Sequence, residues 1–164
     1  MEFQTLDDVF VEQLGDLLDA ERQLVDALPK MAAAAADGKL RTAFEEHLAE
    51  THDHVHRLEE VFGTLGRAAP EETCKAMKGL IAEGKEVLEA TGDPAAKDVA
   101  LIAAAQRVEH YEIAGYGTVR TYAEMLGQRD AERLLQQTLD EEGQTDKKLT
   151  KLATSLINLE AAAK

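Results

Sequence analysis

The chain has 164 residues, of which 45% are hydrophobic and only 4% aromatic, and its formal net charge is -14. This length suits one domain with a real core, and the acidity argues against direct binding to nucleic acid or to anionic membranes, which need a cationic face. Cys74 stands alone, so we expect no internal disulfide and a reducing cytoplasm as the compartment. No apolar run approaches ~18 residues, so we expect no membrane span.

Alanine, leucine, glutamate and lysine dominate, which favours helices, so we predict one all-α domain over residues 1–164. Thr5 and Asp8 have the spacing of a capping box, which begins a helix. We expect Pro29 to kink or briefly break that helix, and Asp37-Gly38 to end it. The predicted helices span residues 6–36, 39–65, 71–90, 94–126 and 130–159.

The last two long helices are expected to begin at Asp93-Pro94, an N-cap followed by proline at the first helical position, and at Asp130. Short links join the long helices in pairs, whereas the stretch from Gly66 to Gly92 is much longer and carries the short helix. This order of links predicts a ferritin-like antiparallel four-helix bundle with one long crossover.

Carboxylates lie where the helical pattern demands apolar residues. Glu142 projects onto the middle of the apolar face of the last helix, and Asp146 lies one turn further on. Glu21 lies at the centre of the apolar face of the first helix. A buried, unpaired carboxylate costs several kcal/mol, so it shifts its pKa, finds a cation or binds a metal.

The third long helix carries Glu109 and Glu112 near its apolar face, where they can be ligands or solvated flank residues. Because this helix is apolar nearly all round, we infer that one side meets the bundle and another a second subunit.

In the second helix, His47, Glu50 and His54 share one edge and can face a metal together. The alternative is a half-buried histidine bonded to a carboxylate. Glu142 and Asp146 form a Glu-x-x-x-Asp pair, and carboxylates suit iron(II), manganese or magnesium.

Four segments resemble the YciE/YciF family of bacterial stress proteins, over roughly residues 4 to 158. They are Leu17–Leu24, Ala43–Leu48, Ala104–Thr118 and Leu139–Glu142. The resemblance implies a ferritin-like bundle with an extra short helix, a homodimer and a role in stress responses, without a well-established activity.

The run from Glu109 to Glu112 is also similar to the third bundle helix of rubrerythrin, in which both acids bind iron. Asp53 and Thr145 stand where rubrerythrin has its helical histidines. The positions that match metal carboxylates of rubrerythrin-like proteins are Glu21, Glu50, Glu109, Glu112 and Glu142.

The predicted metal ligands are therefore Glu21, Glu50, His54, Glu109, Glu112, Glu142 and Asp146. They would hold two iron or manganese ions per chain, which reduce peroxide or oxidise Fe(II), with Tyr111 or Tyr116 as a redox neighbour. One alternative is a non-catalytic stress-induced scaffold with a degenerate metal site and an unidentified protein partner. Another is an iron store, but a dimer encloses no cavity and so disfavours storage. Whether the protein is an enzyme stays open at this stage.

Overall fold

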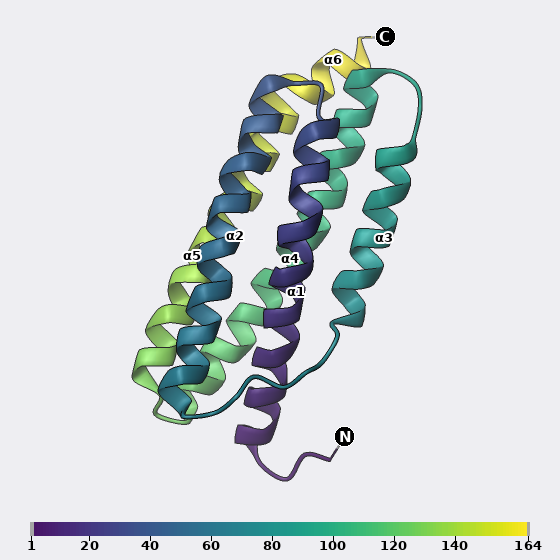
Figure 1. The fold of residues 1–164 in the computed structure, drawn as a ribbon. Coiled ribbons are helices and arrows are strands. Elements are labelled where there is room, and N and C mark those ends of the chain that lie inside the picture. The colour runs from purple at the N-terminus through teal and green to yellow at the C-terminus, as the bar shows by residue number, and fades with distance from the viewer. Residues whose placement is uncertain (1, 164) are drawn as a thin grey trace.

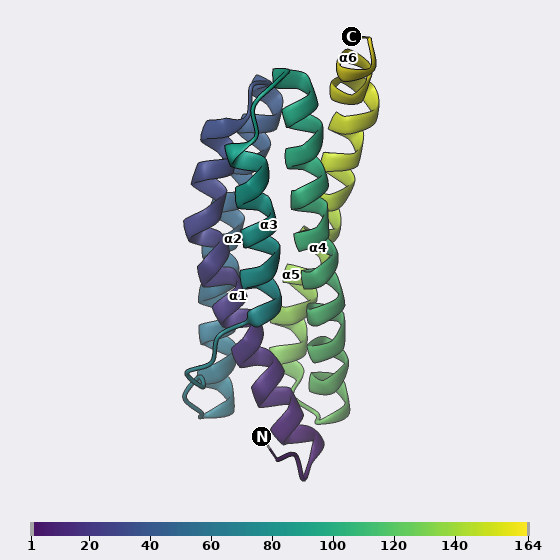
Figure 2. The ribbon, with the colours of Figure 1, turned by 90° about the vertical axis from the view of Figure 1, so that its right-hand side faces the viewer.

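The computed structural model describes residues 2–163, and within them every regular element is helical. The elements are α1 (Leu6–Ala34), α2 (Gly38–Leu65), α3 (Lys75–Glu89), α4 (Pro94–Met125), α5 (Arg129–Leu152), a π-helical turn (Ala153–Ile157) and α6 (Asn158–Ala162). Figure 1 shows α1, α2, α4 and α5 side by side as a long bundle. Helix α3 lies outside it, against α1 and α4 (Figure 2). The predicted all-α class is confirmed.

Two predicted helix starts are confirmed by their caps. The Asp8 amide donates to Thr5 Oγ1 at 3.1 Å and the Thr5 amide donates to Asp8 Oδ2 at 2.8 Å, which is the reciprocal pattern of a capping box. Asp93 Oδ1 accepts from the Ala95 amide at 2.9 Å, and Pro94 opens α4.

The turn between α1 and α2 differs from the prediction. Helix α1 continues through Pro29 without a break and ends at Ala34, before the expected residue 36. Asp37 does not end α1 but caps α2, because its Oδ1 accepts from the Lys39 and Leu40 amides. The buried Asp98 of α4 accepts from the amide of Asp37 at 2.7 Å and so ties this turn to the bundle.

Helix α3 begins at Lys75, four residues later than predicted, because Cys74 caps it. The Cys74 thiol accepts from the Met77 amide at 3.3 Å and lies 3.1 Å from the Tyr111 hydroxyl of α4. The Cys74 amide donates to Asp19 of α1 at 2.7 Å. The buried Met77 joins a core cluster that includes residues of α4. Helix α3 thus covers part of the apolar surface of α4 outside the bundle, and contact of another part with a second subunit stays a prediction.

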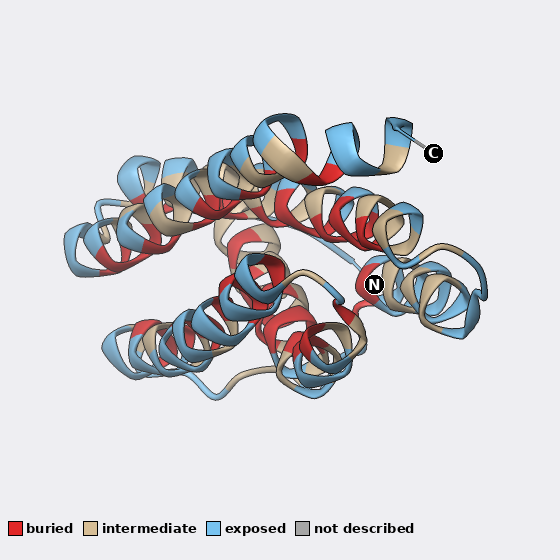
Figure 3. Cartoon of the chain, turned by 90° about the horizontal axis from the view of Figure 1, so that it is seen from above, coloured by how far each residue is buried: buried red, intermediate tan, exposed pale blue. Residues whose placement is uncertain are grey.

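The buried apolar residues form two clusters at different heights of the bundle, with a polar layer between them. One cluster contains Leu24, Leu40, Leu101 and Leu149, and the other contains Leu14, Leu58, Val119 and Leu135. On α2, α4 and α5 buried acids or histidines fall between the two clusters in sequence, and on α1 the buried Glu21 lies next to the boundary, after Ala20 of the first cluster. Figure 3 shows the buried faces turned toward one another in the interior.

Candidate metal centre

The polar layer consists of four carboxylates and two imidazoles contributed by all four long helices. They are Glu21 (α1), His47 and His54 (α2), Glu109 and Glu112 (α4), and Glu142 (α5). None is more than 4% exposed to solvent, and Glu21, His54, Glu112 and Glu142 are fully buried. Charged side chains are almost never buried to this extent unless they are paired or coordinate a metal.

The first group within this layer joins α1, α2 and α5. Nδ1 of His54 lies 2.9 Å from Oε1 of Glu142 and 3.3 Å from Oε1 of Glu21. The buried hydroxyl of Tyr116 donates a 2.5 Å hydrogen bond to the same Glu21 oxygen. Glu21, His54 and Glu142 therefore present donor atoms to one small volume.

The second group joins α2, α4 and α5. Nε2 of His47 lies 3.2 Å from Oε1 of Glu109 and 4.0 Å from Oε2 of Glu142. Glu142 thus takes part in both groups and turns one carboxylate oxygen toward each histidine. This is how a carboxylate that bridges two ions would be placed.

Most of these donor atoms are close to one another but are not aligned for hydrogen bonds. In the described part of the chain, ten buried side-chain nitrogen and oxygen atoms have no hydrogen-bond partner, and all but one belong to the polar layer. Both oxygens of Glu112 and of Glu142 are among them. Such atoms are rare in folded proteins and indicate a missing ion, water or proton.

The charges in the layer balance only if protons or further cations compensate the carboxylates. Burial raises the pKa of Glu112, Glu21 and Glu142, and for Glu112 the charges of neighbouring carboxylates add to this effect. Burial alone would lower the pKa of His54, but the adjacent carboxylates of Glu142 and Glu21 raise it to about 10. Even with both imidazoles protonated, four ionised carboxylates leave two negative charges uncompensated in the interior.

The spacing of the donor atoms fits metal coordination. An ion with bonds of about 2.1 Å holds two ligands at right angles about 3 Å apart. The contacts of His54 with Glu142 and Glu21, at 2.9 and 3.3 Å, and of His47 with Glu109, at 3.2 Å, are close to this value. The mixture of carboxylate and imidazole suits iron(II) or manganese(II).

The structure places two predicted ligands away from this volume. Asp146 is only half-buried, and its Oδ1 accepts from Gln106 at 3.0 Å and lies 3.3 Å from Nε2 of His110, on the outer side of α4. Its predicted position on the core-facing side of α5 is wrong, because residue 146 lies about 40° further round the helix than Glu142. Glu50 is exposed, and its Oε2 lies 3.6 Å from Nδ1 of His47 at the edge of the layer.

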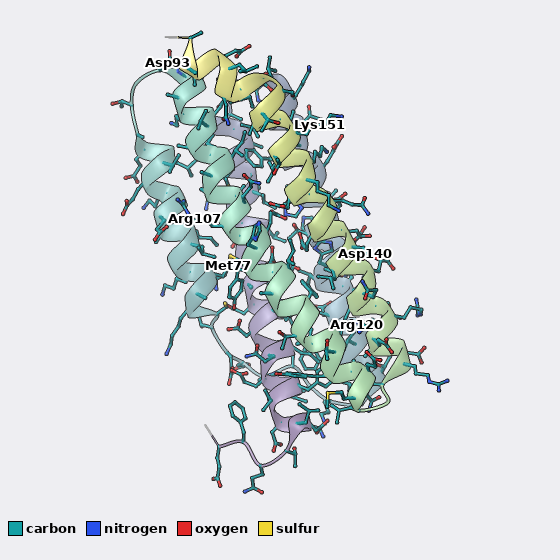
Figure 4. All side chains as sticks on the ribbon, turned by 180° about the vertical axis from the view of Figure 1, so that it is seen from behind. Met77, Asp93, Arg107, Arg120, Asp140 and Lys151 are labelled. Carbon is teal, nitrogen blue, oxygen red and sulfur yellow. The ribbon has the colours of Figure 1, made fainter. Side chains whose placement is uncertain are left out.

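One expectation about the neighbours of the acids is also corrected. Tyr111 directs its hydroxyl to Asp16 and Cys74 rather than to the polar layer. Arg107 of α4 does not pair with the acids of the layer, because it is exposed and lies on the side of α4 that faces α3 (Figure 4).

The prediction missed a pair of residues that supports the layer from outside. Nε2 of His54 lies 3.0 Å from Oε2 of Glu141, and Arg57 binds both oxygens of Glu141 at 2.5 and 3.0 Å. Arg57 also donates to the buried Thr138. Because this contact crosses from α2 to α5, the periodicity of a single helix carries no signal for it.

Fold and site together define an all-helical protein with a buried carboxylate–histidine layer at the middle of its long helices. The chain matches the family described as a domain of unknown function, DUF892, over residues 5–162, and it belongs to that family.

Individual relatives agree with this assignment. Protein YciF of Escherichia coli (strain K12) is 48% identical over 165 residues, which cover 100% of this chain and 99% of YciF. The crystal structure of the E. coli stress protein YciF matches with a TM-score of 0.92 over 95% of this chain and 99% of that one. The predicted resemblance to the YciE/YciF family is thereby confirmed.

More distant structures share the fold. YcfI from Rhodopseudomonas palustris is 40% identical and gives a TM-score of 0.88, with 91% of this chain and 95% of YcfI covered. A protein from Xanthomonas campestris pv. campestris gives a TM-score of 0.75 at 18% identity over 98% of this chain and 100% of that one, which shows a shared fold alone. Among the described residues, no helix is long and apolar enough to cross a membrane.

Proposed function

We propose that this chain is a ferritin-like stress-response protein whose four-helix bundle holds two iron or manganese ions in the polar layer. Glu21, His54 and Glu142 would hold one ion, and His47, Glu109 and Glu142 the other. Glu112 lies in the same layer as a further carboxylate. In its reduced state the pair of ions would supply two electrons, one from each ion, for reducing hydrogen peroxide to water. Alternatively, Fe(II) bound there would be oxidised with dioxygen or peroxide as the electron acceptor. Carboxylate-rich dinuclear centres occur in this class of bundle.

The observation that carries this proposal is the shared position of Glu142. Its two oxygens face His54 and His47, at 2.9 and 4.0 Å, and neither oxygen has a hydrogen-bond partner within the described chain. A carboxylate kept only for structure would be expected to hold hydrogen bonds on both oxygens. The charge of the layer supports the same conclusion, because two divalent ions would balance its four carboxylates while both imidazoles stay neutral as ligands.

A second candidate function has its own support. His54 contacts a carboxylate through each ring nitrogen, so a protonated imidazole can pair with Glu142 and Glu141 without any metal. In addition, Asp53 and Thr145 occupy the positions of the two helical histidines of rubrerythrin-like sites, so neither histidine is present here. Asp53 is also exposed. The alternative is therefore a non-catalytic stress-induced scaffold that binds an unidentified protein partner.

Metal content decides between these two functions. The chain should be produced without a His-tag in cells supplied with iron and manganese, and its metal measured by elemental mass spectrometry. The proposal expects about two equivalents per chain, with a loss in Glu21→Ala and Glu142→Ala but not in Asp146→Ala. A metal-free protein whose melting temperature is unchanged by added iron or manganese would favour the scaffold.

The proposal also includes a homodimer, which the family resemblance implies, and the cytoplasm as its compartment, which the single cysteine favours. Light scattering coupled to size-exclusion chromatography tests the dimer, and cell fractionation tests the compartment. A dimer encloses no storage cavity, so we do not include iron storage in the proposed function.

A further inference from the structure

A crevice between α2 and α5 leads from the surface to the second group of the polar layer. Its walls are His47 and Glu50 on α2 and Gln144, Thr145 and Lys148 on α5, and Glu109 of α4 forms part of its floor. The crevice has a volume of about 160 Å³. It therefore ends at two side chains that are more than nine-tenths buried and belong to the proposed metal centre.

Unpartnered polar atoms point into the inner end of this crevice. Neither ring nitrogen of His47 has a hydrogen-bond partner in the described chain, and Glu109 keeps one free oxygen. At the mouth the polar groups are instead paired. Thr145 donates to Oε2 of Glu50 at 3.4 Å, and Lys148 forms an ion pair with the exposed Glu46.

Larger cavities elsewhere do not lead to the layer. Three of them, with volumes of about 680, 630 and 490 Å³, lie between α1 and α3, between α3 and α4, and between α1 and the segment 69–73. None of the described residues that line these three cavities belongs to the six acid and histidine side chains of the layer.

The geometry points to the α2–α5 crevice as the route by which the buried centre exchanges metal ions and small reactants with solvent. This inference rests on the proposed function. An ion that reaches the second group exchanges bound waters for protein ligands on the way in, because the donor atoms there are almost completely buried. The exposed carboxylate of Glu50, beside His47, is placed to replace those waters.

The burial of the centre sets the class of reactant that it accepts, because none of its six side chains is more than 4% exposed. Hydrogen peroxide and dioxygen are comparable to water in size and can pass from the crevice to the layer. Organic hydroperoxides with aromatic or long alkyl groups, and chelators such as EDTA, cannot reach its buried donor atoms directly. Metal release to a chelator is therefore limited by departure of the ion, and its rate is independent of the chelator's concentration and size.

The test follows the rates of metal uptake and release on the full chain, with Co²⁺ as the probe and its visible absorption as the signal. Gln144→Trp narrows the mouth at an exposed position, and Ala43→Leu narrows the wall from α2. Gln136→Trp places the same bulk on α5 outside the crevice and serves as the control. The double variant Glu46→Ala/Lys148→Ala removes the ion pair at the rim without changing the net charge.

Both narrowing variants should slow uptake and release together by about tenfold, the effect of a modestly raised barrier, while the equilibrium dissociation constant stays the same. The double variant should speed both rates, and Gln136→Trp should leave them unchanged. If narrowed variants take up Co²⁺ as fast as the wild type, the proposed metal centre stands but the crevice is not its route. If the wild type binds no Co²⁺, the proposed function is wrong and this inference is wrong with it.

Discussion

His54 and Glu141 are held 3.0 Å apart, Nε2 to Oε2, across the interface of α2 and α5. A carboxylate of lowered pKa can only accept a hydrogen bond, so it fixes the hydrogen of a neutral His54 on Nε2. Nδ1, which faces Glu21 and Glu142, then keeps its lone pair for a metal. Carboxylates that orient a ligating histidine in this way are a regular part of metal sites.

This relationship predicts the effect of Glu141→Gln. The variant keeps the size of the side chain but weakens its hold on His54, so metal affinity should fall by about 10- to 100-fold. Asp140→Asn changes the neighbouring exposed acid and is the control (Figure 4). Titration of the metal-free proteins with Co²⁺ measures both affinities. Equal affinities would mean that Glu141 forms only a surface ion pair with Arg57.

Glu112 predicts opposite changes in stability and in metal binding. It is fully buried, and neither of its oxygens has a partner within the described chain. Glu112→Leu removes this uncompensated acid and should raise the unfolding free energy of the metal-free protein by about 1–4 kcal/mol. The same change should lower metal affinity.

Urea denaturation of the chelator-treated proteins measures the stability change, and a metal titration measures the affinity. Glu112→Gln is the matched control, because it removes the charge but leaves a polar group without partners, and it should stabilise less. A metal-free Glu112→Leu protein that is less stable than the wild type would contradict the interpretation of Glu112 as an uncompensated charge.

The sequence pattern located part of this layer and missed the rest for physical reasons. Glu21 and Glu142 were predicted correctly to be buried, because each interrupts an otherwise apolar helical face and a single helix suffices to reveal that. The sequence did not decide whether Glu109 is a metal ligand or a solvated residue at the edge of the apolar face of its helix. Its burial depends on which sides of α4 are covered, and that is set by the packing of α1, α3 and α5 around it.

The periodicity of a single helix could not predict contacts between helices. The hydrogen bond of Tyr116 with Glu21 and the ion pair of Arg57 with Glu141 join residues 95 and 84 positions apart. Their formation depends on the relative height and rotation of two helices, which no single pattern encodes. The cap at Cys74 was missed for a related reason, because cysteine is not among the residues that usually signal a helix start.

The metal-free protein should lose stability as the pH rises from about 6.5 to about 10. The pKa of His54 rises from near 6.5 when unfolded to about 10 when folded, so the protonated histidine stabilises fully below 6.5 and this effect is lost toward 10. Glu21, Glu142 and Glu141 face it from α1 and α5, and Tyr116 faces it from α4. The raised pKa values of Glu21 and Glu142 act in the same direction, because ionised buried acids destabilise the fold.

Melting temperatures measured across this range in the presence of a chelator test the prediction. With manganese added, the decline should be smaller, because deprotonated ligands bind metal more tightly as the pH rises. In His54→Gln the chelator-treated protein should show a shallower decline than the wild type. A melting temperature that rises between pH 6.5 and 10 without metal would show that the histidines do not carry charge in the folded protein.

Gly15 predicts a steric effect that is independent of any metal. It lies buried within α1, where a Cβ atom would come 2.7 Å from Cγ and 3.0 Å from Cδ of Pro70 in the crossover segment. Alanine stabilises a helix by about 1 kcal/mol relative to glycine, but the steric clash with the stiff proline ring should outweigh that stabilisation. Gly15→Ala should therefore be destabilised by about 1–3 kcal/mol, as is usual for an overpacked site.

Gly117→Ala is the matched control for this substitution. Gly117 lies within α4, and a Cβ atom there would meet no described atom within 4 Å apart from its chain neighbours and the nearby backbone of its own helix, so alanine should stabilise by the helical preference alone. Urea denaturation of the two variants separates the steric cost of the Pro70 contact from the helix preference of alanine. Both variants gain that preference, but only Gly15→Ala pays the steric cost. If Gly15→Ala were stabilised as much as Gly117→Ala, Pro70 would have to move aside at no cost, and the crossover would not be fixed against α1.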